Sequence, residues 1–106
     1  MTRLEVAFKL AKTIAAQQIE IEHRKGYIEE AKKVNDIETI RHNRKVIENL
    51  ILEIIGIRET GKHFNLNRHD IVGIAHFLSK ELNNDIRLID QFKFQDFKNQ
   101  YDLKRI

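Results

Sequence analysis

The stretch RHNRKVIENLILEIIGI, residues 41–57, changes in character halfway along. Arg41, Arg44 and Lys45 stand in its first five residues, and isoleucine, leucine and valine dominate the rest. At 3.6 residues per turn, the apolar positions of the second half fall on nearly every side of a helix. We therefore expect a helix with exposed cations in its first half and a second half that is surrounded on several sides.

The composition is typical of one folded domain without disulfides. The chain has 106 residues, of which 42% are hydrophobic and 33% charged, and domains most often contain about 100 to 150 residues. We expect a single helical domain over residues 1–106. Cysteine is absent, which excludes disulfides and thiolate zinc sites and is compatible with a cytoplasmic location. No run of residues has the continuous apolar character of a secretory signal or a membrane helix.

The spacing of apolar residues predicts an all-α fold. Proline is absent and glycine occurs only four times, which leaves long stretches suited to helices. We predict a long antiparallel helical hairpin over residues 1–60, with a basic end, and two shorter C-terminal helices over residues 61–106, in a bundle-like arrangement. The expected helices run from Leu4 to the hairpin turn, from about Ile37 to Arg58, after an Asn67 cap to about Asn83, and from Asp85 through Tyr101. Gly61 is expected to end the second of them.

The hairpin turn has two candidate positions. Gly26 follows a His-Arg-Lys run, and cations followed by a glycine often end a helix. Asn35 is followed three residues later by Glu38, which is the spacing of a capping box at the start of a helix. We favour a turn at residues 34–36 and keep Gly26 as the alternative.

Positive charge is concentrated around this turn. Between His23 and Lys45 there are seven cations and four acids, and the remainder of the chain has twelve of each. A hairpin that reverses near Asn35 gathers those cations at its protruding end. Such a cluster predicts binding to the phosphates of nucleic acid, because each contact releases counterions whatever the base sequence. The predicted contacts are Arg24, Lys25, Lys32, Lys33, Arg41, Arg44 and Lys45.

Two other interpretations of the basic end stay open. Its cations could form an ordinary solvated helical face, paired with acids along the helix. Alternatively, the chain is a small protein-binding regulator or inhibitor, of the phage or mobile-element type, that docks on an acidic surface of a partner. We find no glycine-rich phosphate loop and no nucleophile elbow, so we expect no enzymatic activity and no cofactor.

The histidines do not form a metal-binding pattern. His69 and His76 are seven residues apart, which places them about 10 Å apart along a helix axis, too far to share one ion. We therefore expect no metal site.

Several apolar residues predict self-association. Leu52 and Ile55 project away from the apolar side formed by Leu50 and Ile57. The last expected helix carries apolar residues on two sides, so one side could pack on its own domain and the other on a second chain. We expect a homodimer. The candidate interface residues are Leu52, Ile55, Phe94, Phe97 and Tyr101.

Overall fold

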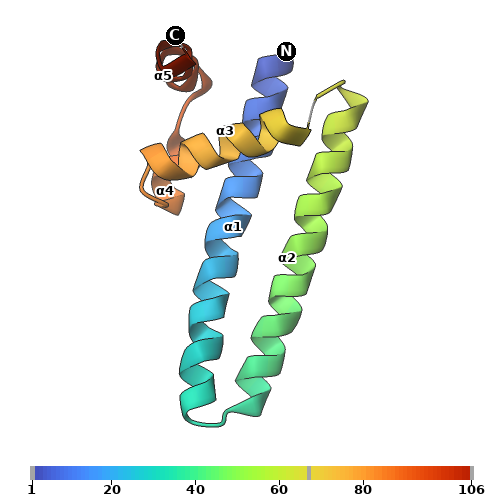
Figure 1. The fold of residues 1–106 in the computed structure, drawn as a ribbon, viewed down its shortest axis with the longest axis vertical. Coiled ribbons are helices and arrows are strands. Elements are labelled where there is room, and N and C mark those ends of the chain that lie inside the picture. The colour runs from blue at the N-terminus through green and yellow to red at the C-terminus, as the bar shows by residue number, and fades with distance from the viewer. Residues whose placement is uncertain (1, 67, 106) are drawn as a thin grey trace.

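The computed structural model describes residues 2–66 and 68–105, with side chains for all of these except 68, 69 and 102–105. Within this part of the chain the structure consists of helices and short connections. The helices are α1 (Arg3–Lys33), α2 (Ile37–His63), α3 (Arg68–Glu81), α4 (Ile86–Gln91) and α5 (Phe94–Arg105). The first two form a long antiparallel hairpin, and the C-terminal helices gather at the end opposite its turn (Figure 1). The predicted all-α hairpin is confirmed.

The hairpin turn lies where we favoured it. α1 continues through Gly26 and ends at Lys33, which excludes the alternative break. Asn35 adopts a left-handed conformation with φ of 55°, which asparagine tolerates better than most residues. Asp36 is therefore the residue that caps α2, and its side chain accepts a hydrogen bond from the amide of Thr39. The predicted capping box of Asn35 and Glu38 is wrong, because Asn35 forms the turn itself.

Gly61 does not end α2, which continues to His63. It is buried, and a Cβ atom added to it would lie 2.5 Å from Cδ1 of Ile71 in α3. The glycine therefore allows α3 to approach α2 closely, a role that local sequence does not show. α3 ends at Glu81, two residues before the predicted end, and the Asn67 cap lies outside the described residues.

The predicted fourth helix is two helices, because three aromatic residues converge on one ring. The ring centroid of Phe8 lies 6.5 Å from that of Phe92, 5.6 Å from Phe94 and 4.7 Å from Phe97. Phe92 and Phe94 are two residues apart and would point to different sides of one helix. The extended backbone at Phe92, with ψ of 124°, separates α4 from α5 and lets both rings approach Phe8.

The core is concentrated at one end of the molecule. Small residues of α1, among them Ala11 and Ala15 at 0% exposure, lie against the shorter helices, and Phe97 of α5 is equally buried. The chain is 49 Å long, and the hairpin extends away from this core towards its turn (Figure 1). The distal part of the hairpin is therefore only two helices thick, and most of its side chains are exposed.

Candidate functional site

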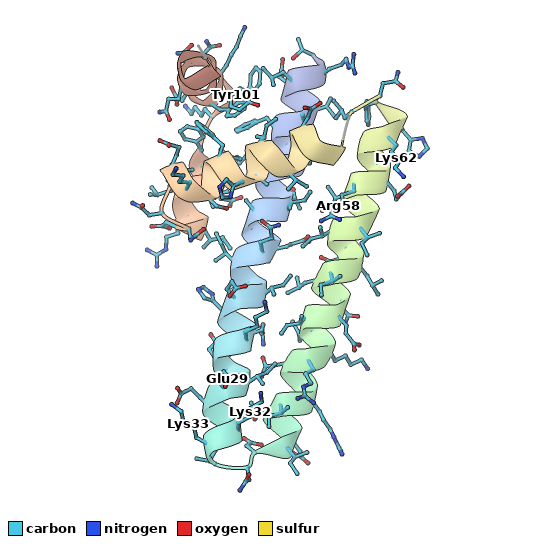
Figure 2. All side chains as sticks on the ribbon, in the orientation of Figure 1. Glu29, Lys32, Lys33, Arg58, Lys62 and Tyr101 are labelled. Carbon is cyan, nitrogen blue, oxygen red and sulfur yellow. The ribbon has the colours of Figure 1, made fainter. Side chains whose placement is uncertain are left out.

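The seven predicted phosphate contacts all lie in the distal end of the hairpin, here residues 20–48. Four are on α1 and three on α2, and the labelled Glu29, Lys32 and Lys33 mark this end in Figure 2. The hairpin therefore brings together two groups of cations from separate helices.

Ion pairs neutralise the three lysines in the distal part of α1. Each of these lysines contacts the glutamate three residues before it: Lys25 with Glu22 at 3.2 Å, Lys32 with Glu29 at 3.1 Å and Lys33 with Glu30 at 3.1 Å. All six side chains are largely exposed, and exposed pairs contribute only about 0 to 1 kcal/mol to stability. These lysines remain accessible, but their local surface carries no surplus charge.

Arg24 is engaged inside the hairpin. Its Nε lies 2.8 Å from Oε1 of Glu20, and its Nη1 donates a hydrogen bond to Oδ1 of Asn43 at 3.1 Å. The guanidinium also lies 5.8 Å from the ring centroid of Tyr27. Asn43 is buried, and its Nδ2 donates to the carbonyl oxygen of Thr39 at 2.9 Å. Arg24 thus links α1 to α2, and we do not retain it among the candidate phosphate contacts.

The net charge of the distal end depends on which flanking residues are counted with it. Glu20 and Glu22 precede His23 in the sequence and Glu48 follows Lys45. When they are included, residues 20–48 contain seven cations and seven acids. The distal end as a whole is therefore neutral, and only a local arrangement of unpaired cations can favour an anionic ligand.

That arrangement occurs on α2, where Arg41, Arg44 and Lys45 form what we call the α2 basic cluster. All three are exposed, and none forms an ion pair with an acidic side chain within the described residues. At 100° per residue they lie within about 100° of one another around the helix, on the side opposite the buried Asn43 and Ile54. They span only about 6 Å of the helix axis. We call this exposed side the outer face of α2.

The turn beside the cluster is fixed by Asp36. The hydroxyl of Thr39 donates to Oδ2 of Asp36 at 2.7 Å, and the amide of Thr39 donates to Oδ1 at 3.2 Å. Both hydrogen bonds lower the pKa of the Asp36 carboxyl below its usual value, and the bond from the Thr39 hydroxyl has the larger effect. The carboxylate therefore stays ionised as a cap of α2, one turn before the basic cluster.

The outer face of α2 continues into an apolar patch formed by Ile51, Leu52 and Ile55. Their exposed fractions are 45%, 65% and 45%, although they lie in the middle of a long helix. Two of the predicted interface residues, Leu52 and Ile55, are thus uncovered by their own chain. Both lie on the side of α2 that faces away from α1.

The aromatic members of the predicted interface are placed differently. Phe97 is 0% exposed, and its ring stacks on those of Phe8 and Tyr101, with centroids 4.7 and 4.9 Å apart. Phe94 and Tyr101 are partly buried against the same core. The interface prediction for Phe97 is wrong, because this side chain fills the core of its own chain and offers no surface to a second one.

A cleft between α1 and α3, lined by both apolar and polar side chains, was not predicted. It has a volume of about 340 Å³, and its lining includes His23 and Glu22 of α1 with His76 and Ser79 of α3. These residues are too distant in sequence for local patterns to connect them. Among the described side chains, no three His, Asp or Glu residues are grouped so that they could hold a metal ion. The side chain of His69 lies outside that set.

Comparison with known proteins adds no assignment: no protein-family model, no curated protein and no solved structure matches this chain.

Among the residues that the structure describes, no helix has a segment both long and apolar enough to cross a bilayer. The outer face of α2 is therefore the surface from which a function can be inferred.

Proposed function

We propose that this protein is a non-enzymatic nucleic-acid-binding protein that contacts phosphates through the α2 basic cluster. One observation carries the proposal: three exposed cations, which form no ion pair with the described acidic side chains, share one side of a helix over a length of about 6 Å along its axis. Two of them are arginines, whose planar guanidinium matches a phosphate with two parallel hydrogen bonds. Lys25, Lys32 and Lys33 are secondary contacts.

The chemistry of these contacts predicts binding without base specificity. Arginine and lysine side chains that reach phosphates release condensed counterions, so affinity falls steeply as salt rises. To contact phosphates, the secondary lysines have to leave their ion pairs with glutamates. This costs little free energy, because exposed ion pairs are weak. We expect duplex and single-stranded ligands to bind, with affinity set mainly by the density of phosphates.

The test is a titration of labelled duplex DNA, single-stranded DNA and RNA at several salt concentrations, read by fluorescence anisotropy. The triple variant Arg41→Glu, Arg44→Glu, Lys45→Glu should bind all ligands more weakly. Its salt dependence should flatten by about 0.9 in slope for each duplex phosphate that the variant no longer neutralises. Circular dichroism should show unchanged helical content, because the three side chains are exposed.

A matched control separates the cluster from net charge. Lys80, Lys93 and Lys98 are exposed lysines outside the hairpin, and their reversal to glutamate changes the net charge by the same amount. This control should retain most of the binding. If both triple variants lose binding equally, or if the α2 variant binds as tightly as the parent, the cluster is not the binding site.

The second candidate is a protein-binding regulator that docks on an acidic partner surface. The apolar patch favours it, because Ile51, Leu52 and Ile55 continue the same exposed face beyond the cations. A parent protein that binds none of the nucleic acids at low salt would favour this candidate. A homodimer and a cytoplasmic location belong to either proposal, and the absence of cysteine is compatible with the latter.

A further inference from the structure

The apolar patch of α2 is exposed in the part of the chain that the structure describes. Ile51, Leu52 and Ile55 are adjacent on the outer face of α2, opposite its buried residues. The long helix α1 runs beside α2 in the hairpin (Figure 1). Leu52, at 65% exposure, lies close to the middle of the 27-residue helix. A contiguous apolar surface of this kind is typical of a contact with another molecule.

Gly56 lies beside this patch and leaves room for a close approach. A glycine inside a helix is less favourable than alanine, so a packing reason is expected. Among the described residues, no heavy atom outside its chain neighbours and the backbone of its own helix lies within 4 Å of the position that its Cβ would occupy. The missing side chain next to Leu52 and Ile55 instead allows the backbone of another helix to come near.

Two opposite charges on the outer face lie at equal distances from Leu52, and Glu48 of the same face lies between Leu52 and the positive one. Lys45 precedes it by seven residues and Glu59 follows it by seven, which is close to two helical turns in each direction. Lys45, Leu52 and Glu59 therefore lie on one side of α2. The pair that Glu59 makes with Lys62, at 3.0 Å, is exposed and easily exchanged.

This charge pattern favours a second copy of the chain as the partner, with its α2 helix packed in one particular orientation. If two α2 helices pack antiparallel about an axis near Leu52, each Lys45 faces the partner's Glu59, and the two apolar patches meet. Parallel packing would set Lys45 against the partner's Lys45 and Glu59 against the partner's Glu59. An unrelated partner does not require charges that are self-complementary about one residue, whereas a two-fold interface does.

We propose that the outer face of α2 is a homodimer interface in which two α2 helices cross antiparallel at Leu52, with Lys45 paired to the partner's Glu59. Packed helices usually cross at an angle, so their ends diverge. Arg41 lies about 16 Å from Leu52 along the axis and stays accessible at the edge of the contact. Lys45 belongs both to this interface and to the α2 basic cluster, so the interface has to be tested in the absence of nucleic acid.

The orientation can be tested by cross-linking, because the chain has no cysteine of its own. With a short bis-maleimide reagent, Leu52→Cys should cross-link to itself far faster than Val34→Cys, a 73% exposed position at the hairpin turn. A mixture of Lys45→Cys and Glu59→Cys proteins should cross-link to each other. Neither should link to itself, because like positions are about 21 Å apart along the antiparallel axes. Self-linking of Lys45→Cys would overturn the antiparallel arrangement.

Sedimentation equilibrium in buffer without nucleic acid tests the energetics. Leu52→Glu should raise the dimer dissociation constant by about tenfold or more, while Val34→Glu should leave it unchanged. Lys45→Glu should weaken the dimer, and the double variant Lys45→Glu, Glu59→Lys should restore it. A parent that is monomeric at high micromolar concentration, or a Leu52→Glu variant as dimeric as the parent, would overturn the proposal. Because no nucleic acid is present, neither result depends on the phosphate-binding proposal.

Discussion

Arg24 and Asn43 join the two long helices in the part of the hairpin farthest from the core, where Nη1 of Arg24 donates a hydrogen bond to Oδ1 of Asn43 at 3.1 Å. Asn43 is the one buried polar side chain among the described residues, and only 3% of it is exposed. Buried polar contacts with satisfied partners favour a single arrangement of the elements they connect. This bond therefore helps to set how α1 and α2 align in the thin part of the molecule.

Removal of this hydrogen bond should destabilise the protein. Asn43→Ala removes the acceptor for Arg24 and the donor to the carbonyl of Thr39, so we expect a decrease of about 1 to 3 kcal/mol in the free energy of unfolding, measured in urea. Asn49→Ala, at an exposed position of α2, is the matched control and should change it by less than about 0.5 kcal/mol. Equal stability of the two variants would contradict the role given to Asn43.

Gly61 and Gly26, two of the four glycines in helices, should respond to alanine in opposite directions. Gly61→Ala places a methyl group 2.5 Å from Cδ1 of the fully buried Ile71, and the end of that side chain has to shift, so we expect a net loss of about 1 kcal/mol from overpacking. Gly26 has no atom within 4 Å of its potential Cβ, and Gly26→Ala should stabilise the protein by up to about 1 kcal/mol through helix propensity. Urea denaturation of both variants provides the measurement. A stabilised Gly61→Ala would show that α2 and α3 are not closely packed there.

Asp36 should make part of the thermal stability sensitive to acid. The Thr39 hydroxyl and amide lower the pKa of its carboxyl in the folded state. The stabilisation is therefore present above the unfolded pKa of about 4 and is lost as pH falls through the lower folded value. Asp36→Asn keeps a capping side chain that does not titrate. Between about pH 5 and pH 2, the midpoint of thermal unfolding should fall further for the parent than for Asp36→Asn. If the unfolding midpoints of the two proteins fell equally with pH, the stabilising role of the ionised Asp36 cap would be contradicted.

Phe97 should be among the most sensitive positions in the core. Its ring contacts those of Phe8 and Tyr101, and it is 0% exposed, so Phe97→Ala should lower the free energy of unfolding by about 3 to 5 kcal/mol. Phe64→Ala removes a ring that is 48% exposed and should have a much smaller effect. Urea denaturation followed by near-ultraviolet circular dichroism would report both. A small effect at Phe97 would mean that α5 does not complete the core.

The helices and the position of the hairpin turn follow from local sequence. Apolar spacing and the absence of proline identify long helices, and asparagine and aspartate next to one another supply the left-handed turn residue and the cap of α2. The pairs between the α1 lysines and the glutamates three residues earlier are equally local. The neutral net charge of the distal end also follows from the sequence, once Glu20, Glu22 and Glu48 are counted with the residues between them.

Only the tertiary structure decided which of these residues are available to a ligand. In the sequence Arg24 looks like an ordinary surface cation. It nevertheless donates a hydrogen bond to Asn43, nineteen residues away, because α2 returns alongside α1. Phe92, Phe94 and Phe97 fall within one expected helix, yet α4 ends before Phe92 and α5 begins at Phe94, and all three rings approach Phe8. Periodicity specifies which residues share a side of a helix, but it does not identify the neighbour that covers that side. The sequence predicted that Leu52 and Ile55 project away from Leu50 and Ile57, but their exposure follows only from the positions of the other helices.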